Sequence, residues 1–152
     1  ICSYMKYIYY TFRTNPFLKE LSYLFGEIFV FNKLNIDFKK FKKKIIKEKP
    51  DLIVGLAKTP KNFSYFDLNC FNQFGKNKRI IKNGEKKYNL FIPKNIDFRI
   101  IDNLTTKKSF CNWTMYKIIN FIKEENLKTK LMFTHIKKDD LEKLETTLKI
   151  RH

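Results

Sequence analysis

Short apolar runs alternate with amphipathic segments along this chain. The apolar runs are four to six residues long and rich in Ile, Val, Leu, Phe and Tyr, which is typical of strands buried on both faces of a sheet. They predict strands at Tyr7–Phe12, Glu27–Asn32, Leu52–Ala57, Phe98–Asp102 and Leu131–Thr134. Each run ends near a polar or turn-forming residue, so the predicted strands are short.

The segments between these runs repeat apolar residues three and four positions apart, which indicates helices with one buried face. They predict helices at Phe17–Phe25, Asp37–Glu48, Cys111–Lys123 and Asp139–Leu148. Asn15 and Pro16 suit the start of the first helix, and Pro50 stops the second. The alternation of strands and helices predicts an α/β fold, a three-layer α/β/α sandwich with a mostly parallel sheet, formed by residues 1–152 as one domain.

Two polar segments interrupt this alternation. Residues 77–87 (NKRIIKNGEKK) predict a hairpin or loop around Asn83 and Gly84, at the periphery of the fold. Residues 103–109 predict a polar turn before the third helix.

In open parallel sheets a ligand binds outside the carboxyl ends of the strands, so residues 58–72, which follow a buried strand, are expected to border a site.

Composition favours a folded protein of a reducing compartment. The 152 residues are 43% hydrophobic and include only four Gly and four Pro, unlike a disordered chain. Cys2, Cys70 and Cys111 are odd in number and widely spaced, unlike a disulfide framework, so we expect a cytoplasmic protein. No apolar run reaches the roughly 18 residues of a membrane helix, so no membrane partner is expected. The first residues, broken by Lys6 and without a small-residue cleavage site, predict a strand rather than a signal peptide.

The formal net charge of +17 raises the alternative of a nucleic-acid-binding domain. Only four of the 32 basic residues are Arg, whereas base and phosphate recognition favours the guanidinium fork. Dispersed lysines give weak, unselective and salt-sensitive binding. Nucleic acid is therefore a less favoured partner, and self-association into a homo-oligomer stays open.

Cys111 and His135 are the residues best suited to chemistry. Cys111 lies where a polar turn enters a helix, and the unpaired N–H groups there stabilise a thiolate and could hold an oxyanion. His135, at the end of the next strand, could serve as its base. An adjacent imidazolium would add to the helix effect, so the sequence predicts a thiol pKa near neutrality. The alternatives are a buried structural cysteine and an ordinary strand-end histidine.

The residues around this pair resemble a known family. Phe110-Cys111-Asn112-Trp113-Thr114-Met115-Tyr116 and Phe133-Thr134-His135-Ile136 are similar to the nucleophile and histidine segments of pyroglutamyl peptidase I, the pyrrolidone-carboxylate peptidase family of cysteine peptidases. The 24-residue separation of the two residues agrees with that family. Two further parts of the chain resemble that family. The stretch from Lys49 to Ala57 is similar to the strand that leads into its Gly-x-Ala-Gly-Gly-Arg loop, and Thr11-Phe12 with Asn15-Pro16 is similar to a shortened form of its Thr-Gly-Phe…Asn-Pro segment.

The resemblance implies a fold and a reaction. The fold is the phosphorylase/hydrolase-like α/β/α sandwich, and the reaction removes an N-terminal pyroglutamyl group from a blocked peptide substrate without metal or other cofactor. Aligning Asp67-Leu68-Asn69-Cys70-Phe71-Asn72 with the family's Glu-Arg-x-Ala-x-Asn makes Asp67 the third member of a triad with Cys111 and His135. The same comparison implies substrate contacts at Phe12, Leu56 and Ala57.

The chain departs from the family at its substrate loops. Lys58-Thr59-Pro60 replaces Gly-Gly-Arg after Ala57, and the glycine-rich loop after the first strand is reduced to Phe12-Arg13-Thr14. The segment between Asn72 and Phe98 is also contracted. These changes favour, as an alternative, a catalytically silent relative that binds a peptide or small molecule.

Overall fold

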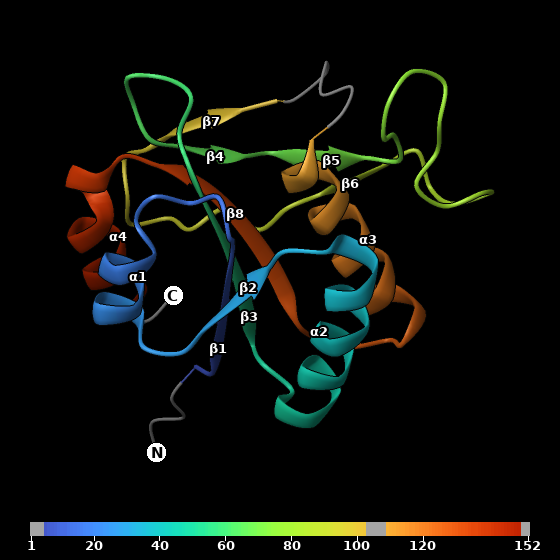
Figure 1. Cartoon of the computed structure of the whole chain (residues 1–152), viewed down its shortest axis with the longest axis horizontal. Coiled ribbons are helices and arrows are strands. Elements are labelled where there is room, and N and C mark those ends of the chain that lie inside the picture. Colours follow the sequence, from blue (N-terminus) through green and yellow to red (C-terminus); the bar gives the residue numbers. More distant parts are fainter. Residues whose placement is uncertain (1–4, 103–108, 150–152) are drawn as a thin grey trace.

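The computed structural model describes residues 5–102 and 109–149 and alternates strands and helices along the chain (Figure 1). The strands are β1 (Tyr7–Phe12), β2 (Ile28–Phe31), β3 (Leu52–Lys58), β4 (Tyr65–Asp67), β5 (Asn69–Phe71), β6 (Lys87–Asn89), β7 (Arg99–Ile101) and β8 (Lys130–Ile136). The helices are α1 (Leu18–Phe25), α2 (Leu34–Glu48), α3 (Phe110–Glu124) and α4 (Leu141–Lys149), with a 3-10 turn at Lys138–Asp140 before α4. Every strand and helix expected from the sequence is present, with ends shifted by up to three residues.

Six strands form one sheet in the order β2-β1-β3-β8-β4-β7. Strands β2, β1, β3 and β8 run parallel to one another, whereas β4 pairs antiparallel with β8 and parallel with β7. The remaining strands, β5 and β6, make a separate antiparallel pair beside α3. The sheet is therefore mostly parallel, as predicted, with two reversed strands at one edge.

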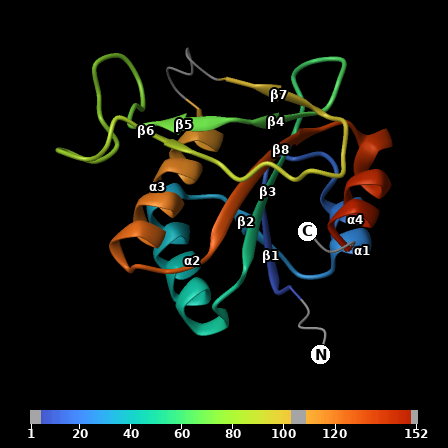
Figure 2. The ribbon, with the colours of Figure 1, turned by 180° about the vertical axis from the view of Figure 1, so that it is seen from behind.

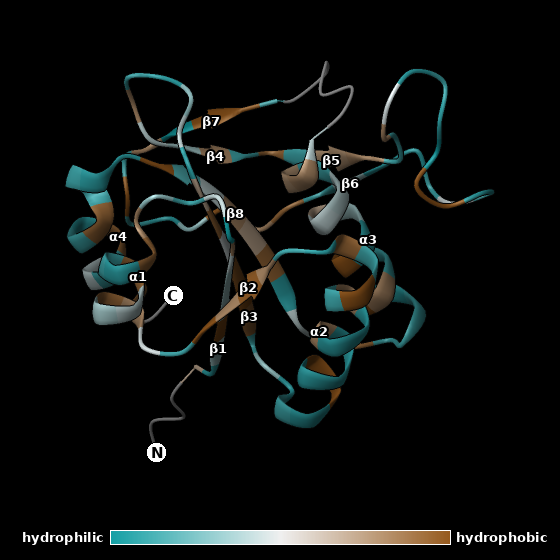
Figure 3. Cartoon of the chain, in the orientation of Figure 1, coloured by the Kyte–Doolittle hydropathy of each residue, from teal (hydrophilic) through white to brown (hydrophobic). Residues whose placement is uncertain are grey.

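Helices cover both faces of the sheet (Figures 1 and 2). On one face α2 and α3 pack on the aromatic side chains of β1 and β8, including Tyr10 and Phe133. On the other face α1 and α4 pack on Leu52, Val54 and Leu56 of β3. In Figure 3, α2 and α3 carry both hydrophobic and hydrophilic residues, as expected of helices with one buried face. The three-layer α/β/α prediction is confirmed.

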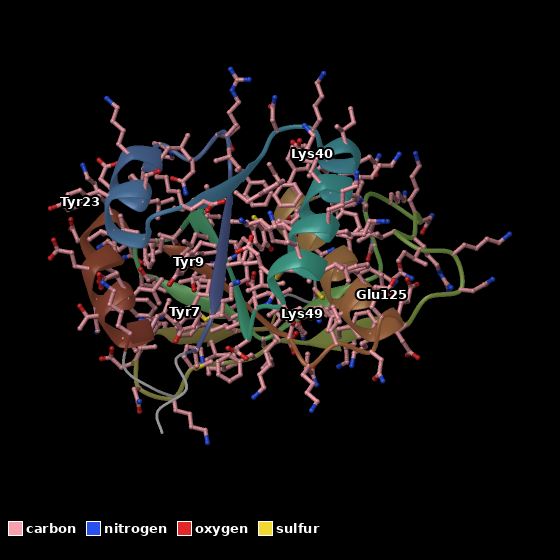
Figure 4. The ribbon with its side chains drawn as sticks, turned by 90° about the horizontal axis from the view of Figure 1, so that it is seen from below. Tyr7, Tyr9, Tyr23, Lys40, Lys49 and Glu125 are labelled. Carbon is pink, nitrogen blue, oxygen red and sulfur yellow. The ribbon has the colours of Figure 1, made fainter. Side chains whose placement is uncertain are left out.

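Large aromatic residues fill the space beneath α1 and α4. The rings of Tyr9 and Phe25 lie 4.9 Å apart, and the Tyr7 hydroxyl donates to the carbonyl of Leu148. Figure 4 shows Tyr7 and Tyr9 beneath these helices, with Tyr23 on the outer side of α1. Tyr7, Tyr9 and Phe25 thus extend the hydrophobic core between the sheet and these two helices.

Side chains bind the backbone just before the first two helices, although the N-cap residues Phe17 and Lys33 make no side-chain cap themselves. The Asp37 carboxylate, in the first turn of α2, accepts hydrogen bonds from the backbone N–H of Asn32 at 2.7 Å and of Lys33 at 2.8 Å, and α2 starts three residues before the predicted boundary. Asn15 accepts from the N–H of Phe17 at 2.8 Å and thereby shapes the entry to α1.

Not every part of the structure corresponds to an expectation from the sequence. Strands β4, β5 and β6 were not predicted, because each has only three residues and no readable alternation. The polar turn expected at residues 103–109 lies, apart from Ser109, outside the described residues. Among the helices of the described ranges, none is long and apolar enough to cross a membrane.

Gly55, at the centre of β3, gives a test of this packing. A Cβ atom there would overlap the Phe133 ring and lie 2.7 Å from the Tyr10 ring, and both rings are fully buried. We expect Gly55→Ala to lower the free energy of unfolding by about 1–3 kcal/mol or more, because the rings must leave their rotamers. Urea unfolding measures this, with Val30→Ala on the exposed edge strand as control; an unchanged midpoint for Gly55→Ala would contradict the packing.

Candidate active site

The junction of β8 with β4 brings His135 and Asp67 together. Tyr65 lies opposite His135 in the antiparallel register, so Asp67, two residues farther along, projects from the same face of the sheet. The Nε2 atom of His135 lies 2.8 Å from the Oδ2 atom of Asp67. An ionised carboxylate can only accept a hydrogen bond, so Nε2 carries the proton and Nδ1 is left as the basic nitrogen.

Burial makes this contact significant. Asp67 is fully buried, and only 12% of the His135 side chain is exposed. A buried carboxylate without a partner costs several kcal/mol, so a chain retains one only where hydrogen bonds compensate. The burial of Asp67 on a strand excludes an ordinary solvated loop carboxylate.

Two aromatic rings fix the imidazole plane. The Tyr65 ring stacks on His135 with centroids 4.5 Å apart and an angle of 16° between the planes. The Phe133 ring lies 5.0 Å from His135 on the same face of the sheet. Sequence reasoning missed Tyr65, although the spacing Tyr65-x-Asp67 would have placed it on the same face once β4 was recognised.

Cys111 lies in the first turn of α3. Ser109 caps this helix, because its Oγ accepts a hydrogen bond from the N–H of Asn112 at 3.2 Å. The Asn112 side chain binds the backbone of β5 and the following loop: it accepts from the N–H of Phe71 at 2.8 Å and donates to the carbonyls of Phe71 and Gln73 at 3.0 Å. The residue after the cysteine therefore anchors the helix start to the β5 segment.

The Cys111 thiol lies within electrostatic range of the other two groups. Burial raises the pKa of Cys111 to about 12, and the Asp67 carboxylate acts in the same direction, whereas hydrogen bonds from Ser109 and the Cys111 backbone lower it. The charges of Asp67 and Cys111 likewise add to the effect of burial in raising the pKa of Tyr65. Asp67, His135 and Cys111 therefore lie on the same side of the sheet, the side that α3 covers, and a hydrogen bond joins His135 to Asp67.

The expected thiolate near neutrality is wrong for the resting protein. The sequence analysis counted the helix start and an imidazolium, both of which lower a thiol pKa. It could not count the desolvation of a half-buried sulfur or the negative charge of Asp67, and these dominate. Cys111 is thus a protonated thiol that needs a base before it can act as a nucleophile.

Cys70 does not share the position of Cys111. Cys70 is fully buried among the core side chains under α3, and burial raises its pKa. Cys2 lies outside the described residues.

The residues expected to contact substrate divide between the two faces of the sheet. Phe12 is almost fully buried and Ala57 is half-buried, and both belong to the same cluster as Cys111. Ala57 is also the direct neighbour of His135 in the parallel pairing of β3 with β8. Leu56 faces the opposite way: its side chain is fully buried under α1 and α4, and its carbonyl accepts a hydrogen bond from Thr11. Only Phe12 and Ala57 lie on the face that carries Cys111.

The segment after β3 is a closed turn. The N–H of Thr59 donates to the carbonyl of Ile136 at 3.1 Å, and its hydroxyl donates to the carbonyl of Phe63 at 2.9 Å. Lys58-Thr59-Pro60 therefore leads directly toward β4, in the place of a glycine-rich loop. In the part of the chain that the structure describes, no group of three or more His, Cys, Asp or Glu side chains could hold a metal ion.

Comparison with solved structures identifies the architecture. The fold is similar to pyrrolidone carboxyl peptidase from Thermococcus litoralis, with a TM-score of 0.68 and 15% sequence identity over 87% of this chain and 76% of that one. It is also similar to pyroglutamyl peptidase I from Bacillus amyloliquefaciens, with a TM-score of 0.66 and 14% identity over 95% of this chain and 93% of that one. Pyrrolidone carboxyl peptidase from Pyrococcus furiosus gives a TM-score of 0.68 at 15% identity over 87% of this chain and 80% of that one. No family model and no curated protein matches the sequence. The chain has a pyroglutamyl peptidase I-like fold.

The raised thiol pKa predicts how Cys111 reacts with iodoacetamide. Because only the thiolate reacts, the alkylation rate at Cys111 should rise about tenfold per pH unit from pH 7 to 9.5 without a plateau. Asp67→Asn removes the nearby negative charge, so at a given pH it should speed the reaction about 3- to 10-fold. Mass spectrometry of the Cys111 peptide measures both rates.

The matched control is Asp97→Asn, which removes an equally negative but exposed carboxylate paired with Lys143. It should leave the rate unchanged. A rate at Cys111 that levels off between pH 6 and 8, or an Asp67→Asn rate no faster than wild type, would contradict the electrostatic description of the site.

Proposed function

We propose that this chain is a cysteine peptidase that removes an N-terminal pyroglutamyl group from peptides, with Cys111, His135 and Asp67 as its triad. The observation that carries the proposal is the 2.8 Å contact between His135 and a fully buried Asp67, on the side of the sheet covered by the helix whose first turn holds Cys111. A pyroglutamyl peptidase I-like fold supports the same reaction. The three solved structures named above are peptidases for this group.

In the first step the thiol must lose its proton, because its pKa lies far above neutrality. The Nδ1 atom of His135 accepts that proton as the sulfur attacks the carbonyl carbon of the pyroglutamyl residue. Asp67 stabilises the resulting imidazolium through Nε2. Backbone N–H groups at the start of α3 hold the negative oxygen of the tetrahedral intermediate.

The second half of the cycle returns the enzyme to its starting state. The carbon–nitrogen bond breaks, the leaving amine takes the proton from Nδ1, and the pyroglutamyl group remains on Cys111 as a thioester. Water then attacks the thioester carbonyl while Nδ1 takes its proton. That proton passes to the departing sulfur, which releases pyroglutamate and restores the thiol.

Phe12 and Ala57 are the wall that we assign to the pyroglutamyl ring. Both are apolar and lie in the cluster that includes Cys111. Such a surface suits an uncharged lactam better than a free glutamate, whose ammonium and carboxylate would lose hydration there. Leu56 is left out of this wall because its side chain faces the other layer.

A silent relative that binds a blocked peptide is the second candidate. It is favoured by the raised pKa of Cys111 and by the closed turn at Thr59, which stands where the family carries a glycine-rich loop. Such a protein would keep the apolar wall of Phe12 and Ala57 and the buried contact of His135 with Asp67, but it would turn over no substrate.

Hydrolysis of pyroglutamyl-aminomethylcoumarin separates the two candidates. The wild-type protein should release the fluorophore, and Cys111→Ala should lower kcat/KM at least about 10³-fold because no other group replaces the nucleophile. The prolyl and glutamyl amides of the same fluorophore should not be cleaved, since the first lacks the lactam carbonyl and the second is charged.

Cys70→Ala is the matched control, because it removes the other described cysteine and should leave activity within a few-fold of wild type. Equal hydrolysis by Cys111→Ala and wild type would exclude the thiol mechanism. A folded wild-type protein without hydrolysis at any pH between 6 and 9 would favour the silent relative.

A further inference from the structure

A polar cavity outside the candidate active site lies between β5 and the loop that follows it. Its volume is about 600 Å³. The lining combines three cations with carboxamides and a backbone glycine: Phe71, Asn72, Gln73, Asn77, Lys78, Arg79, Gly84 and Lys86. We call it the basic pocket. No carboxylate lines it, so its chemistry suits an anion.

The cations of the basic pocket are free of acidic partners. None of Lys78, Arg79 and Lys86 forms an ion pair within the described residues. The sequence from residue 76 to 87 holds six Lys or Arg and one acid, Glu85. Converging like charges repel one another, and a bound anion would relieve that repulsion.

The walls of the pocket are held in place by hydrogen bonds. The buried side chain of Asn72 accepts from the N–H of Ile81 at 2.8 Å and donates to its carbonyl at 2.7 Å. The N–H of Phe74 donates to the carbonyl of Lys78 at 3.0 Å, and Asn77 and Asn83 adopt the left-handed conformation at the turns. The loop is polar along much of its length and projects beside α3 (Figures 1 and 3). It is a built pocket rather than a spread of surface lysines.

The pocket is joined to the candidate active site through one side chain. Asn112 follows Cys111 directly and makes three hydrogen bonds to Phe71 and Gln73, and both of these residues line the pocket. A ligand held in the basic pocket would therefore contact residues that the neighbour of Cys111 holds by hydrogen bonds. An extended peptide advances about 3.3 Å per residue, so each residue after the blocked one carries the chain farther from the scissile bond toward such a pocket.

We propose that the basic pocket binds carboxylate side chains of the peptide substrate on the leaving-group side of the scissile bond. The inference rests on the proposed function and adds a substrate class to it: pyroglutamyl peptides with acidic residues a few positions after the blocked one. Arg79 offers two parallel donors to a carboxylate, and Lys78, Lys86 and the carboxamides of Gln73 and Asn77 complete the set. A nucleic-acid phosphate would satisfy the same donors, but the link through Asn112 to the segment that carries Cys111 favours a short peptide substrate.

Binding to a protein that cannot turn over gives the test. The Cys111→Ala variant is titrated with two fluorescent, C-terminally amidated peptides, pyroglutamyl-Ala-Gly-Asp-Asp and pyroglutamyl-Ala-Gly-Asn-Asn, at 0.15 M salt. Fluorescence anisotropy should show the acidic peptide bound about tenfold more tightly, because charge-assisted hydrogen bonds exceed neutral ones. Equal Kd values for the two peptides would overturn the proposal.

A charge-matched pair of variants locates the effect. Lys78→Gln, Arg79→Gln and Lys86→Gln together should abolish the preference for the acidic peptide. The control is Lys39→Gln, Lys40→Gln and Lys43→Gln, which removes three exposed charges from α2; Figure 4 shows Lys40 on the outer side of that helix. The control should keep the preference, and an equal loss in both triple variants would mean diffuse attraction and contradict a specific pocket.

Two further outcomes keep this proposal separate from the proposed function. If wild type cleaves the fluorogenic amide but binds both peptides equally, the pocket assignment fails and the peptidase stands. If the acidic preference holds without any cleavage, the peptidase fails and the pocket stands in a silent relative. A single-stranded oligonucleotide that displaces the acidic peptide at equal or lower concentration would instead assign the pocket to nucleic acid and overturn the proposal.

Discussion

The hydrogen bond between His135 and Asp67 depends on a reversal of strand direction inside the sheet. Strand β8 has a parallel neighbour, β3, on one side and an antiparallel neighbour, β4, on the other. The parallel side places Ala57 beside His135, and the antiparallel side stacks Tyr65 on the ring and brings Asp67 to Nε2. A fully buried carboxylate is tolerable only with such partners, so the pair ties the chemistry of the site to the topology of the sheet.

The sequence predicted the frame of this arrangement well. Strands β1, β3 and β8 and helix α3 have long or strongly apolar patterns, and those patterns report burial against neighbouring layers. The position of Cys111 at a helix start followed from the same pattern. A resemblance of short motifs supplied Asp67, which no periodicity would have selected.

Other parts could not be predicted because their causes are not local. Strand β4 has three residues, and only its pairing with β8 and β7 defines it. The thiol pKa was expected near neutrality from neighbours along the chain, yet desolvation and the charge of Asp67, 44 positions away in the sequence, raise it. The opposite facing of Leu56 and Ala57 follows from strand alternation, but which of them meets the site is set by the layers above each face.

The central claim is that Asp67 orients His135 so that Nδ1 is the base for Cys111. Nitrogen NMR of the protein labelled with ¹⁵N-histidine tests it most directly, because the chain has only two histidines, His135 and His152. At a pH where the imidazole is neutral, the account predicts a protonated Nε2 and a bare Nδ1 for His135, and loss of that single tautomer in Asp67→Asn. A proton on Nδ1 in the wild-type protein, or the same tautomer in both proteins, would contradict it.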